Sequence, residues 1–194
     1  MDELSARDKN ILDVSIKVMR SLSTLRDPYY NGHEKRVSFM AIRLASELKM
    51  DAGFIERLKY AAWMHDIGKI AMAESILNKL RLSHSEVSMI HSHSEMGGVI
   101  AKSLDLEDGE IETMVLQHHE NWNGTGYPHR LKGDQICIGA RILRVCDCFD
   151  AMTNIRPYRP IFTTKDTLHE MDKEIGTSFD PDIYKVFRAE MEAI

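Results

Sequence analysis

Histidines and carboxylates are spaced along this chain in a way that suits metal binding. Nine histidines occur in 194 residues, which is a high count. Two sequence pairs place a histidine directly beside another potential ligand, His65-Asp66 and His118-His119. Neighbouring residues on a helix differ in direction by about 100°. We therefore expect each pair to lie at a helix end, where both side chains can reach one site.

Three more residues of the same chemistry belong to other predicted helices: His33 lies at the start of the second, His93 inside the fourth and Asp147 inside the sixth. Five imidazoles and two carboxylates that converge from five helices suit two divalent transition metals, with one carboxylate as a bridge. Two metals about 3.5–4 Å apart activate a water molecule and clamp the oxygens of an in-line phosphoryl displacement. A lone histidine is more often a surface or hydrogen-bonded residue than a ligand, and the histidines at 84, 91, 129 and 169 are interpreted in that way.

Cys146 and Cys148 flank Asp147 and offer an alternative in which a thiolate is a ligand. On a helix the two cysteines point about 100° to either side of Asp147, so they cannot share its direction. Small buried cysteines are common in protein cores, and we interpret both residues as core.

Helical periodicity dominates the chain, and alternating strand patterns are nearly absent. An apolar stripe between Leu4 and Leu25, which includes Val18 and Leu22, predicts a first helix that packs in the core or at a dimer face. Further helices are predicted around residues 37–48 and 51–68, with Gly68 at the end of the second, and around 83–100, 111–118, 142–149 and 180–187.

Three start signals support these helices: Asp51 as an N-cap, a capping box of Ser83 with Glu86, and Asp180 before a proline. Residues 121–139 form one long irregular segment with four of the 11 glycines. A loop of that length inside a compact domain is more often functional than accidental. The expected fold is a single-domain, all-α bundle.

Composition narrows the class of protein. Lys and Arg number 25 against 30 Asp and Glu, and a net charge of -5 argues against binding to polymeric nucleic acid or to an acidic membrane. Three cysteines without a CxxC pair favour the reducing cytoplasm over a disulfide scaffold. The charged N-terminus does not suit a signal peptide, and no apolar run is long enough to insert into a membrane. We predict a soluble cytoplasmic protein.

Several separated motifs occur together in this chain. They include WMHDIGK at 63–69, HHENWNGTGYP at 118–128, GARILRVCDCFDAMTNIRPYR at 139–159 and GTSFDP at 176–181. With these motifs the sequence resembles the HD-GYP family, bacterial cyclic dinucleotide phosphodiesterases within the HD metal-hydrolase superfamily. The likeness runs from about residue 27 to 187. It implies a helical bundle of the HD-domain type at 27–194, preceded by an N-terminal helical segment at 1–26.

The resemblance implies a set of metal ligands at matching positions. It implies one ion held by His33, His65, Asp66 and Asp147, and a second ion held by Asp66, as the bridge, with His93, His118 and His119. His93 is preferred to His91 because the family pattern has a glycine four residues after the ligand, here Gly97. Some members hold a third ion through a glutamate where this chain has Tyr29, so we expect two ions. The family is associated with iron and manganese.

The resemblance also implies substrate contacts. Lys69 matches a lysine that touches the scissile phosphate, Arg156 and Arg159 match residues that grip the phosphates, and Gly126 and Tyr127 belong to the namesake loop. The alternatives are that Lys69 caps its helix and Tyr127 packs in the interior. The two arginines could instead pair with acidic side chains, Asp150 or Glu120.

The leading hypothesis is hydrolysis of cyclic di-GMP to pGpG, GMP or both, through a hydroxide activated by two metals, with Asp66 and Lys69 as catalytic residues. One alternative is a silent domain that binds a cyclic dinucleotide or a partner, which the unusual segment 76–82, without the family's Pro-Gly turn, keeps open. Others are an HD hydrolase of another nucleotide, such as cyclic GMP-AMP, and a diiron oxygenase. Partners considered are a second copy of the chain in a homodimer and a regulatory protein. Only about 26 residues precede the matching region, too few for a fused sensor domain, so we expect either that regulatory input comes otherwise or that the chain is an excised piece.

Overall fold

The structure is a computed structural model that describes residues 4–26, 32–77, 79, 81–104, 109–154 and 162–193. The described residues form helices and loops and contain no strand; one isolated bridge joins Ile175 and Phe179. This confirms the expected all-α class.

The helices follow one another along the chain, and η denotes a 3₁₀ helix. They are α1 (Ala6–Arg26), α2 (His33–Glu47), α3 (Ala52–Met64), η2 (Ile67–Ala71), α4 (Glu74–Leu77), α5 (His84–His91), α6 (His93–Ser103), α7 (Glu110–Gln117), η3 (Gly133–Gln135), α8 (Ile138–Thr153), α9 (Thr164–Asp172) and α10 (Pro181–Glu192).

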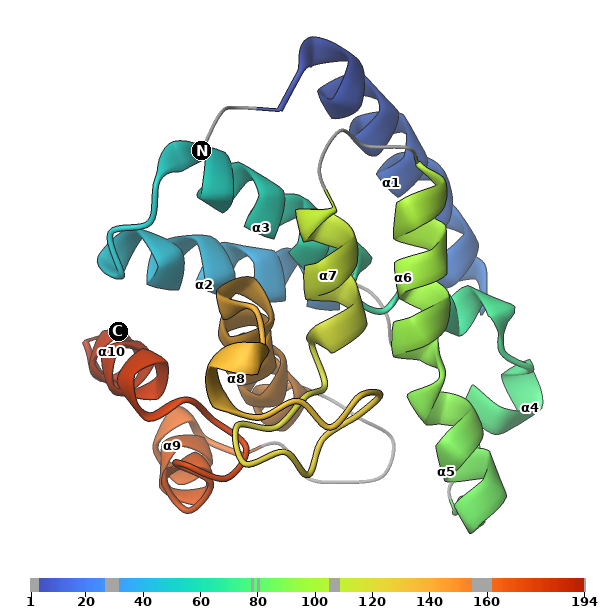
Figure 1. Ribbon diagram of the computed structural model, residues 1–194. Coiled ribbons are helices and arrows are strands. Elements are labelled where there is room, and N and C mark those ends of the chain that lie inside the picture. Colours follow the sequence, from blue (N-terminus) through green and yellow to red (C-terminus); the bar gives the residue numbers. More distant parts are fainter. Residues whose placement is uncertain are drawn as a thin grey trace.

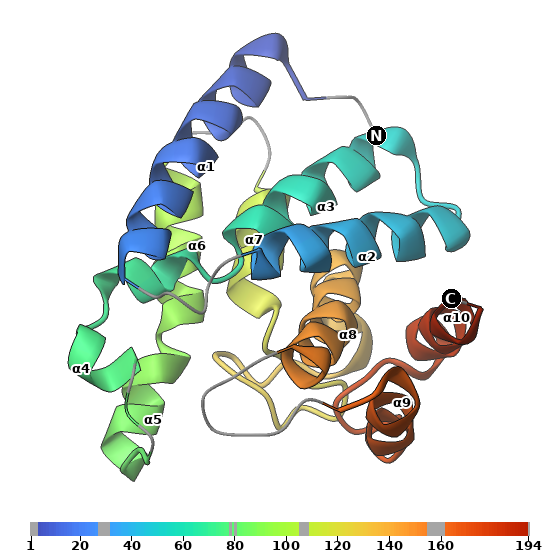
Figure 2. The same ribbon diagram turned by 180° about the vertical axis from the view of Figure 1, so that it is seen from behind.

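Helix α8 lies at the centre of the arrangement (Figure 1). It packs against α2, α7, α9 and α10, while α6 packs against η2 and α7. Both views place α4 and α5 at one end of the molecule and α9 and α10 on the opposite side of α8 from them (Figure 2). Buried apolar residues of α8, such as Ile142, Leu143 and Phe149, belong to the same core as Leu44 of α2 and Phe187 of α10. The site described below therefore lies among helices that share one core.

The three predicted start signals are confirmed. The Asp51 side chain accepts from the Phe54 N–H, and Ser83 and Glu86 form a complete capping box. The Asp180 side chain accepts from two N–H groups of the first turn of α10. Such caps satisfy donors that a helix leaves unpaired at its N-terminus, so they fix where each helix begins.

Two predictions about helix boundaries are wrong. The helix that starts after Ser83 is not continuous, because it breaks at Ser92 into α5 and α6. Gly68 does not end a helix; α3 already ends at Met64, and Gly68 lies inside η2. Helix α9, which lacks a long apolar stripe, was not predicted at all.

The predicted stripe of α1 is only partly core. Leu12 and Ile16 are buried, but Val18 is 55% exposed and Leu22 43% exposed. The helix is oriented so that the side chains of residues 8, 12 and 16 are buried, and it packs against α3 and η2. None of the described helices has both the length and the apolar character needed to cross a bilayer.

Candidate metal centre

Seven potential ligands lie at one place where helix ends meet. His33 is the first residue of α2 and His93 the first of α6, while His65-Asp66 and His118-His119 directly follow α3 and α7. Asp147 projects from the middle of α8. The structure thus brings together all seven side chains that the sequence predicted as ligands, from five separate parts of the chain.

Two glycines allow these elements to approach. A Cβ at Gly68 would overlap the carbonyl oxygen of His93 and lie 2.7 Å from the Gly97 nitrogen. A Cβ at Gly97 would lie 2.9 Å from a methyl group of Val115. The absence of side chains lets η2 pack backbone to backbone against α6 and lets the Val115 side chain of α7 lie against Gly97. The contact of η2 with α6 brings Asp66 to within 3.3 Å of His93 Nε2.

The ligands form two groups that share one carboxylate. One atom from each of His33, His65 and Asp66 lies within 4.8 Å of the others, and the same holds for Asp66, His93, His118 and His119. Asp147 adjoins the first group, with Oδ1 at 3.3 Å from His33 Nε2 and 4.0 Å from His65 Nε2. Asp66 faces the first group with Oδ2 and the second with Oδ1. Asp66 therefore offers one carboxylate oxygen to each group.

The hydrogen bonds of His93 and His118 indicate that a cation belongs between them. Nδ1 of His93 contacts the Ile90 carbonyl at 2.6 Å, and Nδ1 of His118 contacts the Val115 carbonyl at 2.6 Å. A carbonyl only accepts, so each Nδ1 carries its proton and each neutral ring presents a lone pair on Nε2. These two Nε2 atoms face each other at 3.2 Å. Facing lone pairs, beside a buried carboxylate, fit a divalent transition metal.

Electrostatics keep these groups ready to bind a cation. Burial lowers the pKa of His93 to about 4 and holds the pKa values of His118 and His119 well below the usual range, so all three rings are neutral. Burial alone would raise the Asp66 pKa, but Lys69 and the surrounding histidines hold it well below its usual value. Metal ligands must be deprotonated, and the four residues of the second group meet this requirement.

A second layer of contacts around His33 was not recognised from the sequence. Asp150 Oδ2 lies 2.7 Å from His33 Nδ1, and Arg36 donates to both oxygens of Asp150 at 2.6 and 3.0 Å. Burial lowers the pKa of His33, but hydrogen bonds to Asp147 and Asp150 outweigh it and raise the pKa to about 9. At neutral pH this ring therefore carries a proton, which a metal ion bound there would have to displace. A carboxylate behind a ligating histidine orients the ring and increases its basicity. The only sequence signal was the spacing of Asp150, three residues after Asp147 on one helix.

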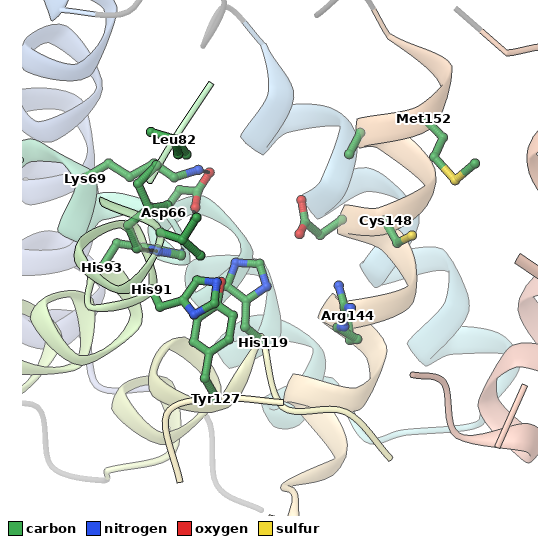
Figure 3. A pocket seen from close by; sticks show the side chains of 14 residues that line it. Asp66, Lys69, Leu82, His91, His93, His119, Tyr127, Arg144, Cys148 and Met152 are labelled. Carbon is green, nitrogen blue, oxygen red and sulfur yellow. Dashed lines mark hydrogen bonds and ion pairs between the residues drawn. The ribbon is translucent and has the colours of Figure 1, made fainter. Parts of the chain in front are cut away.

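A pocket of about 390 Å³ opens over the second group of ligands. Figure 3 shows the residues of α8 that line it, among them Arg144 and Met152, facing Asp66, Lys69 and His93 across the pocket. Its walls also include apolar residues of α5 and the segment before it, and the full lining is Asp66, Lys69, Leu82, Val87, Ile90, His91, His93, His119, Tyr127, Arg144, Asp147, Cys148, Ala151 and Met152.

Lys69 and Tyr127, two of the predicted substrate contacts, both line this pocket. Lys69 Nζ lies 2.5 Å from Asp66 Oδ2, and its side chain is 30% exposed. Tyr127 stacks on His91 with ring centroids 3.8 Å apart, and its next ring neighbours are His119 at 4.9 Å and His93 at 6.3 Å. His91, predicted as a surface or hydrogen-bonded residue, is therefore part of the pocket wall.

The loop that carries Tyr127 is held by Glu120. Its carboxylate accepts from the His129 N–H at 2.7 Å and from the Leu131 N–H at 3.0 Å, which folds the loop back onto the end of α7. Gly126 is needed for this fold, because a Cβ there would lie 2.5 Å from the His119 carbonyl oxygen and overlap the Asn121 nitrogen. Gly126 therefore faces the chain's own backbone, and it places Tyr127 in the pocket.

Two of the predicted contacts, Arg156 and Arg159, lie outside the described residues, as does Tyr29. Their suggested acidic partners have other contacts: Asp150 is held by His33 and Arg36, and Glu120 by the loop backbone. The cysteines beside Asp147 belong to neither group of candidate ligands. Burial raises the pKa of the Cys146 thiol well above its usual value, which fits the interpretation of this residue as core.

Sequence comparison finds relatives with named activities. The chain is 32% identical to a cyclic di-GMP phosphodiesterase of Thermotoga maritima, over 96% of this chain and 51% of the relative. It is 31% identical to a cyclic di-GMP phosphodiesterase of Pseudomonas aeruginosa, over 96% of this chain and 45% of the relative. A 3'3'-cGAMP-specific phosphodiesterase of Vibrio cholerae is 29% identical, over 93% of this chain and 39% of the relative. The chain thus spans about half the length of these relatives, or less.

Comparison with solved structures supports the fold. A cyclic GMP-AMP specific phosphodiesterase of V. cholerae superposes with a TM-score of 0.67 at 18% identity, over 91% of this chain and 48% of that one. A second solved structure is the HD domain of the phosphodiesterase PgpH from L. monocytogenes in complex with cyclic-di-AMP. It superposes with a TM-score of 0.61 at 17% identity, over 90% of this chain and 93% of that one. The family model described as HD domain matches residues 17–183. With the helical fold and the paired His-Asp motif at its centre, the chain belongs to the HD domain family.

Proposed function

We propose that this domain is a metal-dependent phosphodiesterase that hydrolyses cyclic di-GMP to pGpG, GMP or both. The observation that carries the proposal is the arrangement of two ligand groups that share Asp66 beside a pocket lined by Lys69. The relatives named as cyclic di-GMP phosphodiesterases support the choice of substrate. We assign the activity to residues 27–194, with residues 1–26 as an N-terminal helical segment.

Seven residues would hold two divalent metal ions, with iron or manganese as the candidates. His33, His65, Asp66 and Asp147 would hold one ion; Asp66, His93, His118 and His119 would hold the other. When bound, the ions would supply Lewis acidity toward a phosphate and lower the pKa of a water molecule.

The protein's own residues would position and neutralise the substrate. Lys69 has three donors, so it can keep its contact with Asp66 and also donate to a phosphate oxygen at the mouth of the pocket. The positive charge of Lys69 would stabilise the negative charge that develops on the phosphate oxygens in the transition state. Tyr127 is held in the pocket by the loop, and its pKa is raised by burial, so its hydroxyl stays protonated and can donate.

Hydrolysis of 3'3'-cGAMP is the second candidate, because relatives specific for that compound match this chain at about the same identity. The test is to incubate the Mn²⁺- or Fe²⁺-loaded protein with each cyclic dinucleotide and to separate the products by chromatography. We expect linear dinucleotide or mononucleotide from cyclic di-GMP, and faster turnover of cGAMP would favour the second candidate.

An Asp66→Asn variant should lose turnover, since it removes the shared carboxylate. An Asp182→Asn variant is the matched control, because Asp182 is exposed in the first turn of α10, far along the chain from the ligands. Binding of cyclic di-GMP by the metal-loaded protein without any hydrolysis would refute the enzymatic proposal and favour a silent receptor.

A further inference from the structure

We propose that Arg144 binds the phosphate of the substrate beside the candidate metal ligands, on the side of the pocket opposite Lys69. This inference rests on the proposed function and adds a substrate-binding residue to it. Arg144 is not among the residues that the sequence motifs indicated as contacts.

The position of Arg144 follows from helix geometry. It lies three residues before Asp147 on α8, and residues three apart share one helix face. Both line the pocket. In Figure 3 the Arg144 side chain approaches from α8, while Lys69 approaches from the other side, with Asp66 and His119 between them. A phosphate at the ligand cluster would therefore have one cationic side chain on each side.

The contacts of Arg144 leave its charge available. Nε lies 3.1 Å from Asn121 Oδ1, a neutral acceptor that fixes the guanidinium plane. Within the part of the chain that the structure describes, no carboxylate forms an ion pair with Arg144. Two other arginines near it differ: Arg36 is neutralised by Asp150 and Arg141 by Asp180. Among the described residues Arg144 thus presents to the pocket a charge that no ion pair neutralises, although the Glu174 carboxylate lies near enough for Arg144 to help lower its pKa.

The chemistry of the free donors suits a phosphate. With Nε engaged by Asn121, the four N–H groups on the two terminal nitrogens remain to donate. A guanidinium fork matches the oxygens of a phosphate, and its charge does not depend on pH in the working range. Lys69 and Arg144 can therefore donate to different oxygens of one phosphate.

An arginine can also recognise the O6 and N7 atoms of guanine. The position favours the phosphate, because Arg144 shares a face of α8 with Asp147 and lines the pocket together with His119, and both of these are candidate metal ligands. The apolar part of the lining, which suits a base better, is formed by residues such as Leu82, Val87 and Met152.

The test compares Arg144→Gln and Arg144→Lys with the native protein on two substrates, cyclic di-GMP and bis(p-nitrophenyl) phosphate, a diester without bases. We expect Arg144→Gln to lower kcat/KM roughly 10²-fold on both, as loss of a preorganised donor to a transition state does. Arg144→Lys should recover part of the loss. Arg7→Gln is the charge-matched control, since Arg7 is exposed on α1, and it should leave both activities unchanged.

Metal content and melting temperature are measured on every variant, so that a folding defect is recognised. A loss confined to cyclic di-GMP would assign Arg144 to the base and overturn the proposal. Native activity in Arg144→Gln, or a loss that only follows a lower metal content, would overturn it as well.

Failure of the proposed function gives a different result, namely a native protein that hydrolyses neither substrate. In that case the role of Arg144 is tested by measuring how tightly inorganic phosphate binds to the metal-loaded protein. Binding at least tenfold weaker in Arg144→Gln supports the inference, and equal binding overturns it.

Discussion

The contact between η2 and α6 offers a sharp test of how the ligands are assembled. Replacing Gly68 by Ala places a methyl group on top of the His93 carbonyl oxygen and 2.7 Å from the Gly97 nitrogen. Both obstacles are backbone atoms, so no side chain can turn aside to make room. The two segments must move apart, and with them Asp66 and His93, whose ligand atoms are 3.3 Å apart.

The expected cost can be worked from this overlap. Overpacking a well-filled core costs typically 1–3 kcal/mol, and an obstacle made of backbone places Gly68→Ala at the upper end, about 3 kcal/mol. In a chain of this size about 1 kcal/mol shifts the melting temperature by roughly 2–4 °C, so we expect a decrease of about 6–12 °C. Denaturation of the chelator-treated protein measures this cost, and metal analysis after reloading should show a reduced metal content.

Gly98→Ala is the matched control, one residue after Gly97 in the same helix. The atoms nearest to a Cβ at Gly98 would belong to the Leu116 side chain, at 3.4 Å, which is ordinary van der Waals contact. Because alanine is favoured over glycine in a helix interior by about 1 kcal/mol, this variant should be as stable as the native protein or more so. If Gly68→Ala kept native stability and native metal content, the close packing would not be what holds Asp66 and His93 together.

Three further outcomes are expected. Asp150→Asn should weaken metal binding about 10- to 100-fold, because it removes the negative charge behind His33. Asp172→Asn is the control: it alters a carboxylate that is bound to Arg188, and it should leave the metal content unchanged. An equal loss of metal in both variants would refute the role of Asp150. Adding Mn²⁺ to the metal-free protein at about 100 times its Kd should raise the free energy of unfolding by about 2.7 kcal/mol, which a thermal melt would detect; no shift would argue against a site among these ligands. The hydrogen bond from Arg188 lowers the pKa of Asp172 in the folded protein. The stability that this hydrogen bond contributes is therefore fully present above the usual Asp pKa of about 3.9, and it is lost as the pH falls through the lower pKa of the folded state. In an acid titration, Asp172→Asn should lose less stability with falling pH than the native protein does.

Much of the site could be predicted from the sequence because its ligands are placed by local rules. The pairs His65-Asp66 and His118-His119 follow directly after helices, so their positions depend on where a few turns end. The caps at Asp51, Ser83 and Asp180 depend on hydrogen bonds within three residues, and a single sequence contains that information.

The tertiary structure decided the contacts between residues far apart in the chain. Asp150 lies 117 positions from His33, and no local pattern pairs a carboxylate with one of several histidines. His91 and Arg144 reach the pocket because α5 and α8 face each other across it, which depends on how the whole bundle packs. The role of Gly68 is of the same kind: its spacing resembles a helix end, but its neighbour is a carbonyl group of another helix.

The sequence by itself therefore determined the helical class and the starts of several helices, and together with the family resemblance it indicated the seven candidate ligands. Only the tertiary structure decided which residues stand behind those ligands and which line the pocket. The physical reason is that caps and helix ends are short-range hydrogen bonds, whereas the second layer of a site is made by packing between helices that the chain order does not specify.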